Sequence, residues 1–267
     1  MGAPRLNGIA ALGLQAYTRV YILGIEKGKQ VISSINKAAA VMCVLALTSN
    51  AYAVAPDFMD KLAADSRPTE DKIRDGARRP YQVMQLLGVE EGMTAIDVRA
   101  GGGWYTRVLS AAVGPSGKVI SQAGPRALER ENGQAARDLA ASLGNTEASF
   151  ENVGDMEANS ADVAVTALNM HHGNAERSIP GLRDILRVLK PGGVAAIIDH
   201  IGLPEMDNSR LHRMLVADVR QWLLEAGFEI VEESDLLRTN ADDHTLSVVD
   251  PILGRNVDRF LFVVRKP

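Results

Sequence analysis

The chain has 267 residues, of which 46% are hydrophobic and 23% are charged, and its formal net charge is −4 at pH 7. This composition supports a buried core and excludes a disordered or collagen-like chain. The single cysteine, Cys43, excludes an intramolecular disulfide.

The N-terminal segment has the layout of a secretory signal peptide. Lysines precede an apolar run over 38–47, and the small-x-small tripeptide Ala-Tyr-Ala follows at 51–53. We therefore expect residues 1–53 to be a signal peptide with an over-extended start, cleaved after Ala53, so that the mature protein is periplasmic or secreted. The apolar run is shorter than the roughly 20 residues of a membrane-spanning helix, so we expect no stable span after cleavage. A buried hydrophobic helix is the alternative interpretation.

The rest of the chain is acidic. Residues 1–53 carry five of the 29 basic and one of the 33 acidic residues, so their removal lowers the net charge to about −8. Nucleic acid is therefore not expected as a partner, because binding it requires dense Lys and Arg. We expect the polar segment 54–68 to be a leader and residues 69–267 to form the folded domain.

Helices and strands are predicted to alternate along this domain. Apolar spacing predicts a helix over 69–87, which Pro80 should break or kink. In chain order, the further segments are strands at 93–98, 117–122, 147–154, 161–168, 193–200, 228–237 and 258–266, and helices at 104–114, 126–144, 174–190 and 207–227. This order predicts a doubly wound α/β domain with a mostly parallel, seven-stranded sheet and an antiparallel last strand.

A glycine cluster follows the first predicted strand. In such sheets ligands bind beyond the carboxyl ends of the strands, where the strand order reverses. Gly101 and Gly103 can take positive φ, and the helix that follows offers free N–H groups. A nicotinamide dehydrogenase is disfavoured, because Thr106 replaces the third glycine of G-x-G-x-x-G and Gln122 replaces the ribose-binding acid.

The same stretch fits a different glycine pattern, acid-h-G-x-G-x-G, which binds S-adenosylmethionine. Asp97, Gly101 and Gly103 match this pattern, and Arg99 replaces its first glycine. The order of "DVRAGGGWYTRVL", "GKVISQ", "VGDME", "ADVAVTALNMHH" and "LRDILRVLKPGGVAAIIDH" resembles class I S-adenosylmethionine-dependent methyltransferases over about residues 69–265.

A narrower resemblance is to exported bacterial predicted methyltransferases. The stretches "SRPTEDKIRDGARRP", "GGGWYT" and "DDHTLSVVDPILGRNVDRF" carry it. In that group the first glycine is often missing, so Arg99 is typical of the subgroup. The resemblance implies S-adenosylmethionine as the cofactor.

The resemblance also implies roles for individual residues. Asp97 would hold the methionine end through the turn, and Gly101 and Gly103 would give backbone access. Gln122 stands where an acid usually grips the ribose hydroxyls, and an uncharged amide grips less strongly.

Three further residues are implied in the donor site. Asp155 would accept a hydrogen bond from the adenine amine, and Met156 would pack on the ring. Asn169 would lie where the methyl donor and the methyl acceptor meet.

Histidines supply the candidate base for an acceptor that carries a proton. His200, at the end of a predicted strand, is preferred to His172, whose His-His pair is often structural in this fold. A metal set of Asp199, His200, Asp243 and His244 has no short ligand spacing, so no metal is expected. The polar loop 240–260 is a candidate lid or substrate wall, or else a solvated loop.

These observations predict S-adenosylmethionine-dependent methyl transfer to an unidentified small molecule. The alternative is a catalytically inactive, exported binding or scaffold protein that retains the fold. Two features favour the alternative: S-adenosylmethionine is made in the cytosol, and Arg99 and Gln122 both fall on the donor site. The fold alone does not decide between them.

Overall fold

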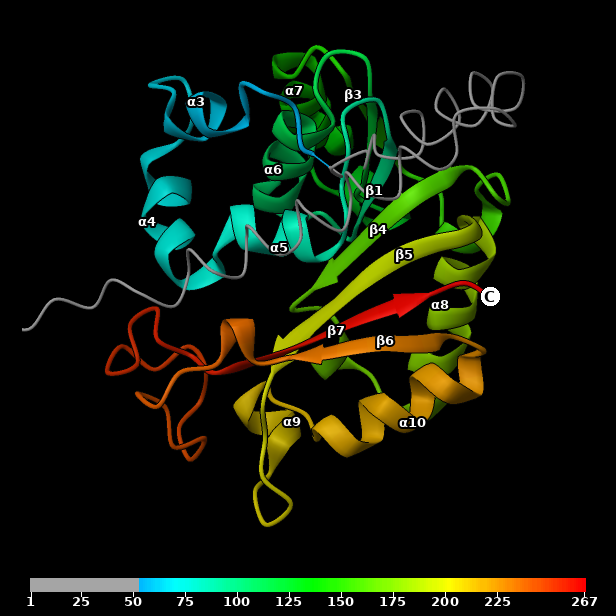
Figure 1. Ribbon diagram of the computed structural model, residues 1–267. Helices are drawn as coiled ribbons and strands as arrows, with labels where there is room; N and C mark the ends of the chain where they lie inside the picture. The colour runs from blue at the N-terminus through cyan, green and yellow to red at the C-terminus, as the bar shows by residue number, and fades with distance from the viewer. Residues whose placement is uncertain (1–52) are drawn as a thin grey trace, which may run out of the picture. The chain divides into compact units, whose positions relative to one another are not determined.

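Seven strands form one sheet in the computed structural model, which describes residues 53–267 (Figure 1). The strands are β1 (Thr94–Val98), β2 (Lys118–Gln122), β3 (Thr146–Ser149), β4 (Ala161–Ala167), β5 (Leu189–His200), β6 (Glu229–Ser234) and β7 (Arg259–Arg265). Their order is β3-β2-β1-β4-β5-β7-β6, and β7 pairs antiparallel with both β5 and β6, whereas the other neighbouring strands of this sheet pair in parallel. The predicted doubly wound sheet with an antiparallel last strand is confirmed.

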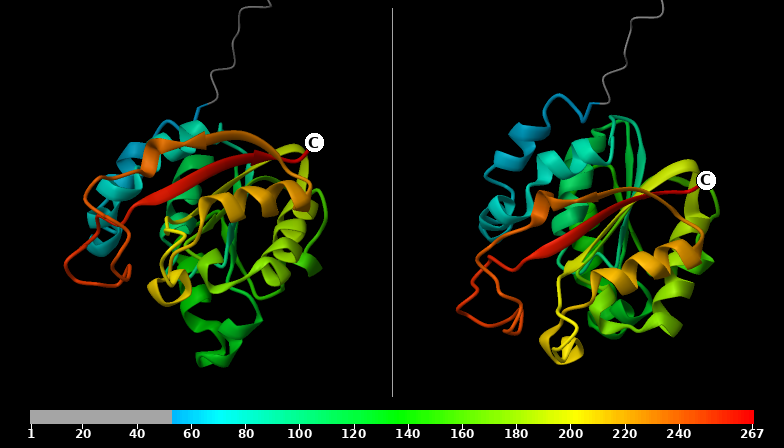
Figure 2. Two further views of the ribbon diagram at one scale, coloured as in Figure 1. Left: turned by 90° about the horizontal axis from the view of Figure 1, so that it is seen from below. Right: turned by 60° about the horizontal axis from the view of Figure 1, so that its bottom comes forward.

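Helices cover both faces of the sheet (Figures 1 and 2). The α-helices are α3 (Phe58–Ala63), α4 (Thr69–Arg78), α5 (Pro80–Leu86), α6 (Trp104–Val113), α7 (Gln134–Ser142), α8 (Ala175–Val188), α9 (Asn208–Leu211) and α10 (Val216–Ala226). Successive strand residues point to opposite faces, so Ala95 joins a core with α5 and α6, and Ile96 joins a core with α8 and α10. Burial on both faces explains why the central strands are almost continuously apolar.

The segment 54–68 contributes to the first of these cores, although the sequence predicts it as a leader. Phe58 and Leu62 of α3 are buried there, because their spacing places them on one side of a helical turn. Arg67 is also buried, and its guanidinium pairs with Asp75 of α4. This segment is therefore part of the folded unit. The predicted signal peptide lies outside the described residues except for Ala53, and no helix in 53–267 is long and apolar enough to cross a membrane.

One predicted helix break is confirmed, and two predicted helices are interrupted. Arg79 separates α4 from α5 in a left-handed conformation, directly before Pro80. The predicted helix 126–144 is wrong in its first half, which forms the 3-10 turns η1 (Pro125–Glu129) and η2 (Glu131–Gly133) before α7 begins. At the break, Gly133 has φ +70°, and the Phe150 ring fills the space where a β-carbon would stand.

The predicted helix 207–227 is also wrong as a continuous element. It ends after the single turn α9, and His212 follows with φ +56°. The chain is extended through Leu215 before α10 begins. This interruption brings His212 to the end of the sheet where the candidate site lies.

Candidate functional site

The candidate site lies where the chain reverses its direction across the sheet. From β1 the chain moves outward to β2 and β3, and it then returns to β4 on the other side of β1. Asn169, just after β4, donates a hydrogen bond from Nδ2 to the Val98 carbonyl oxygen at the end of β1, 3.2 Å away. The two strand ends that flank the switch point are thus joined, and ligands bind at this place in open α/β sheets.

The turn after β1 is open to a ligand at its centre. A β-carbon on Gly101 would meet only the Arg99 carbonyl oxygen, at 3.8 Å, and one on Gly102 would meet nothing within 4 Å. Gly103 differs, because its β-carbon would lie 2.1 Å from a Leu139 methyl group of α7. Gly101 and Gly102 therefore present backbone to the open side, whereas Gly103 allows α7 to pack closely.

Arg99 stands at the start of this turn and does not line the hollow described below. Its side chain is exposed, and its backbone has φ +53°, a conformation that favours glycine. An L-residue there costs roughly 1–2 kcal/mol. The Arg99 N–H donates to Gln122 Oε1 at 2.9 Å, which helps to hold the turn in this strained conformation.

Asp97 lies buried beneath the turn. Its Oδ2 accepts a hydrogen bond from the Thr106 hydroxyl at 2.6 Å, and that hydroxyl also lies 3.1 Å from Ser121 Oγ. Burial raises the pKa of Asp97 to about 7, although the hydrogen bonds from Thr106 favour the charged form. Asp97 thus ties the start of α6 to β1 and supports the turn from below.

Gln122 connects the turn to the loop after β3. Its Nε2 donates to the Glu151 carbonyl oxygen at 2.8 Å, while its Oε1 accepts from Arg99. Both polar ends of the amide are therefore bonded to backbone groups of the protein. The residue therefore holds the turn after β1 and the loop after β3 in place.

In the loop 151–156, Asp155 is exposed and Met156 is buried. Asp155 is exposed, and its carboxylate accepts a hydrogen bond from Asn152 Nδ2 at 2.9 Å, so it can also accept one from a ligand. The Met156 side chain is buried in the core beneath α8, where it packs with residues of the sheet. Arg187 of α8 donates to the carbonyl oxygens of Gly154 and Met156, and sequence reasoning did not identify this support.

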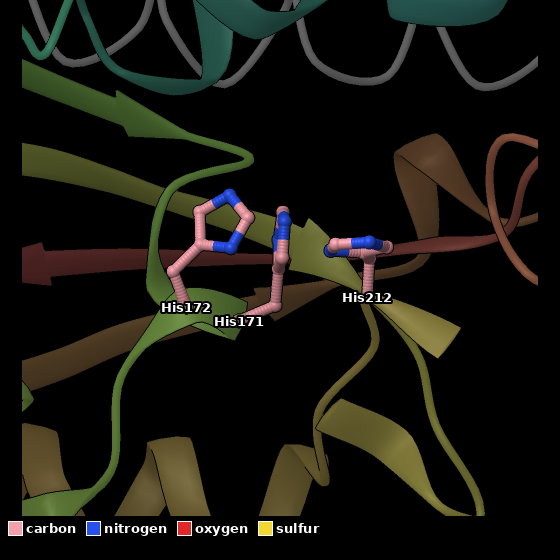
Figure 3. A group of neighbouring side chains, drawn as sticks. All are labelled: His171, His172 and His212. Carbon is pink, nitrogen blue, oxygen red and sulfur yellow. The ribbon is translucent and has the colours of Figure 1, made fainter. Parts of the chain in front are cut away.

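Three histidine side chains converge beside the switch point (Figure 3). His171 and His172 come from the 3-10 turn η4 (Met170–His172), and His212 comes from the break after α9. The ring centroids of His171 and His172 are 4.1 Å apart, and the His212 ring is 5.5 Å from each. One ring nitrogen of each lies within 4.8 Å of the others, so these imidazoles could hold a divalent cation.

Asp199 sets the orientation of His171. This carboxylate is fully buried and accepts backbone N–H groups from Met170, His171 and His200 at 2.8–3.1 Å. Because Asp199 acts as the acceptor, His171 Nδ1, 2.7 Å from Oδ1, is the donor, and His171 Nε2 is left free. Desolvation and the neighbouring His171 and His212 lower the pKa of His172.

The metal set considered from sequence does not come together. His244 Nε2 lies 2.9 Å from Asp258 Oδ2, and Asp243 is exposed, with its carboxylate bonded to Thr245. Asp199 instead lies with His171 and His200. The loop 240–260, here called the late loop, and the end of β5 therefore do not share one ligand cluster.

His200 is a buried histidine with a defined tautomer. Its Nδ1 lies 3.2 Å from the His212 carbonyl oxygen, which can only accept, so Nδ1 carries the proton and Nε2 carries the lone pair. Burial lowers the pKa of His200 to about 4, so the imidazole is neutral at pH 7. In this state it can accept a proton or a hydrogen bond.

His200 lines a hollow of about 380 Å³, here called the larger hollow. Its walls come from α4, from the ends of β4, β5 and β7, and from the loop 240–260, which is orange to red in Figure 1. The lining residues are Arg74, Ala77, Arg78, Leu168, His200, Val248, Val249, Gly254, Arg255, Val257 and Arg259. The late loop therefore forms a wall of this hollow.

A buried ion pair anchors that wall. Arg213 donates from both Nη atoms to the Asp242 carboxylate at 2.9 Å, and neither side chain is accessible to solvent. Asp242 also accepts the backbone N–H groups of His244 and Asp258. The loop is thus fixed to the segment between β5 and α10.

Part of this chain matches a known protein family. The model of the ubiE/COQ5 methyltransferase family matches residues 72–232. Demethylmenaquinone methyltransferase of Staphylococcus aureus is 31% identical over 121 residues, which are 44% of this chain and 47% of that protein. The chain thus matches about half the length of this curated relative.

Several solved structures share the fold. A SAM-dependent methyltransferase from Aquifex aeolicus superposes with a TM-score of 0.54 at 21% identity, over 75% of this chain and 99% of that one. A possible exported protein from Bordetella parapertussis superposes with a TM-score of 0.50 at 18% identity, over 73% of this chain and 68% of that one.

Proposed function

The chain belongs to the ubiE/COQ5 methyltransferase family, and from this premise we propose that it transfers a methyl group from S-adenosylmethionine to a small-molecule acceptor. The observation that carries the proposal is the open glycine turn at the switch point, beside a separate hollow. A two-substrate transfer requires such a pair of adjoining sites, because the two reacting atoms must be held in line.

The donor side suits an adenosyl group. Gly101 and Gly102 leave space on the open side of the turn, and the exposed Asp155 carboxylate can accept a hydrogen bond from an adenine amine. Bound S-adenosylmethionine would supply an electrophilic methyl group on a sulfonium. The chain itself contributes positioning, through Asp97 beneath the turn and Gln122 behind it.

The acceptor side supplies the larger hollow and a neutral base. When the acceptor nucleophile carries a proton, His200 Nε2 would take it as the nucleophile bonds to the methyl carbon and the bond from that carbon to the sulfonium sulfur breaks, which leaves neutral S-adenosylhomocysteine. The defined tautomer of His200 supports this role, since its Nδ1 is already committed to the His212 carbonyl oxygen. His172 is more exposed than His200 and lies with His171 and His212. It is therefore less suited than His200 to act as the base.

Calorimetric titration of the full chain with S-adenosylhomocysteine tests the donor site. We expect saturable binding, and we expect Asp155→Ala to weaken it about tenfold, as for loss of one charged hydrogen bond. Glu157→Ala is the matched control, because this acid is also exposed but lies outside the turn η3 (Val153–Asp155). Equal loss in both variants would contradict the assignment of Asp155.

The second candidate, an inactive scaffold, is favoured by one feature of the donor side. Both ends of the Gln122 amide are bonded to protein backbone, so this position offers no charged grip on a ribose. Complete absence of heat with S-adenosylmethionine and S-adenosylhomocysteine at millimolar concentration would support the scaffold and overturn methyl transfer.

We also propose that the protein is exported. The basic, apolar and small-x-small order of residues 27–53 supports this, as does the similarity to the possible exported protein from Bordetella parapertussis. Sequencing the N-terminus of protein recovered from the periplasm should give Val54 as the first residue. Recovery of the intact chain from the cytosol alone would contradict export.

A further inference from the structure

Arginines dominate the walls of the larger hollow and of a smaller one beside it. The smaller hollow, of about 150 Å³, shares Ala77, Arg255, Val257 and Arg259 with the larger one. Together the two are lined by Arg74, Arg78, Arg79, Arg238, Arg255 and Arg259, and by no Asp or Glu. This concentration of positive charge occurs in a chain whose net charge is −4.

Two of these arginines have carboxylate partners within the protein. Arg74 Nη1 lies 3.2 Å from Asp71, and Arg238 Nε lies 3.0 Å from Asp258. The other four, Arg78, Arg79, Arg255 and Arg259, pair with no carboxylate among residues 53–267. Three of these four, all but Arg79, line the larger hollow.

Of these three arginines, Arg259 gives the strongest indication that a ligand binds here. It is only 7% exposed, and its Nε is buried with no hydrogen-bond partner. Arg213, the other deeply buried arginine of this region, has a bidentate carboxylate in Asp242. Because an unpaired buried charge is strongly unfavourable, the contrast indicates that the partner of Arg259 comes from outside the chain.

Arg259 lies beside His200, the candidate base. Arg259 and His200 are direct partners across the antiparallel pair of β7 and β5. Side chains of such a pair lie on the same face of the sheet, about 5 Å apart at their β-carbons. A group held by Arg259 would therefore lie close to His200.

Arg78 faces the same hollow from α4. Its guanidinium stacks on the Trp104 ring, with the central carbon 4.9 Å from the ring centroid, and this contact limits its motion. Trp104 is itself held by hydrogen bonds from Nε1 to the Asp71 carbonyl oxygen and to Asp75. Burial lowers the pKa of both Arg78 and Arg259, and the positive charge of Arg78 lowers the pKa of Arg259 further.

The remaining lining of the larger hollow is apolar. Leu168 follows β4, and Val248, Val249 and Val257 come from the late loop. A hollow of about 380 Å³ lies in the range that encloses small organic ligands, roughly 300–1,000 Å³. It thus combines a cationic end with an apolar wall.

We propose that the larger hollow binds a small organic anion, with its carboxylate or other oxyanion between Arg78 and Arg259 and its apolar body against the late loop. This assignment rests on the proposed function in one respect: it makes the methyl acceptor an organic acid. The binding site itself stands on the unpaired arginines. Guanidinium groups suit this ligand because they bond planar oxyanions through two N–H groups.

Titration of the full chain with matched probes at low ionic strength tests the assignment. Benzoate and phenyl phosphate carry the anion, and benzamide is the uncharged probe of similar shape. We expect the better of the two anions to bind at least about tenfold more tightly than benzamide, and their ratio separates a carboxylate site from a phosphate site. Equal binding of all three probes overturns the proposal.

Substitutions then locate the site. Arg259→Met and Arg78→Met should each weaken the preferred anion about tenfold, whereas the remote, exposed Arg126→Met should not change its affinity. Because Arg259 lacks a partner, Arg259→Met should keep or raise the thermal midpoint, while Arg213→Met should lower it. Unchanged anion affinity in both hollow variants overturns the proposal.

The outcome is distinguishable from failure of methyl transfer. Arg259→Met should bind S-adenosylhomocysteine as the wild type does, because the residue lies on the acceptor side. Anion binding without S-adenosylhomocysteine binding would reject the transferase and retain the anion site. S-adenosylhomocysteine binding without a preference for the anionic probes would reject the anion site and retain the proposed transferase.

Discussion

The proposed donor side and the proposed acceptor side of this site are built in different ways. The donor side consists of the turn 99–103, the end of β2 and the loop 151–156, which lie within about 60 residues of one another in the chain. The acceptor side joins α4, three strand ends and the late loop, so that Arg78 and Arg259, about 180 residues apart in sequence, face one hollow. Local sequence therefore determines the donor side, whereas tertiary structure creates the chemistry of the acceptor side.

The largest expected effect is a loss of stability when the ion pair that anchors the acceptor wall is broken. Asp242→Ala leaves Arg213 buried without its carboxylate, and breaking such a pair costs about 3–5 kcal/mol. Urea denaturation should show this loss, and S-adenosylhomocysteine affinity of the folded fraction should stay unchanged because the donor side is separate. The adjacent Asp243→Ala is the control, since its exposed carboxylate bonds only Thr245. A wild-type midpoint for Asp242→Ala would show that the loop is held by other contacts.

The next effect concerns packing on the donor side. Gly103→Ala should destabilise the protein by about 2 kcal/mol, from a positive φ and from the contact that forces Leu139 to rotate. Gly102→Ala has open space and should leave the unfolding midpoint within experimental error. The pair distinguishes a glycine required for packing from one that faces a ligand. Equal midpoints for the two variants would refute the close approach of α7 to the turn.

The titration of Asp97 is expected to change the free energy of unfolding by a smaller amount per pH unit. Its pKa is raised to about 7 in the folded protein, so the folded state holds a proton that the unfolded state releases near pH 4. The stabilisation is complete below pH 4 and is lost as the pH rises through 7, at up to about 1.4 kcal/mol per unit. Asp97→Asn should remove this slope when urea denaturation is repeated between pH 4 and 8. Parallel curves for variant and wild type would show that Asp97 is charged throughout.

The same contrast explains what could be predicted from sequence. The sheet and the turn were predictable, because apolar strands and the 97–103 pattern are contiguous. The break at His212 was not, because 207–227 has helical composition and only tertiary contacts select the left-handed residue. Arg259 was also missed, since it begins an ordinary apolar strand and its lack of a partner is visible only in three dimensions.

The smallest expected effect concerns Arg99, the residue that most separates this chain from the general glycine pattern. Its positive φ costs roughly 1–2 kcal/mol, while glycine loses about 0.5–1 kcal/mol more chain entropy on folding, so Arg99→Gly should raise stability by at most about 1.5 kcal/mol. Arg99→Lys is the matched control, because it keeps both the charge and the side-chain strain.

Ligand binding distinguishes the two possible roles of the Arg99 charge. Arg99 lowers the pKa of His172, so its positive charge reaches the candidate site. A sulfonium is also positive, and removing a like charge at about 8 Å in water should favour S-adenosylmethionine about twofold while leaving neutral-sulfur S-adenosylhomocysteine unchanged. If Arg99→Gly instead weakens both ligands equally, Arg99 binds the carboxylate that they share. In that case Arg99 gives the donor side an ion pair that glycine could not make, and calorimetry of the two ligands against the three proteins decides between these roles.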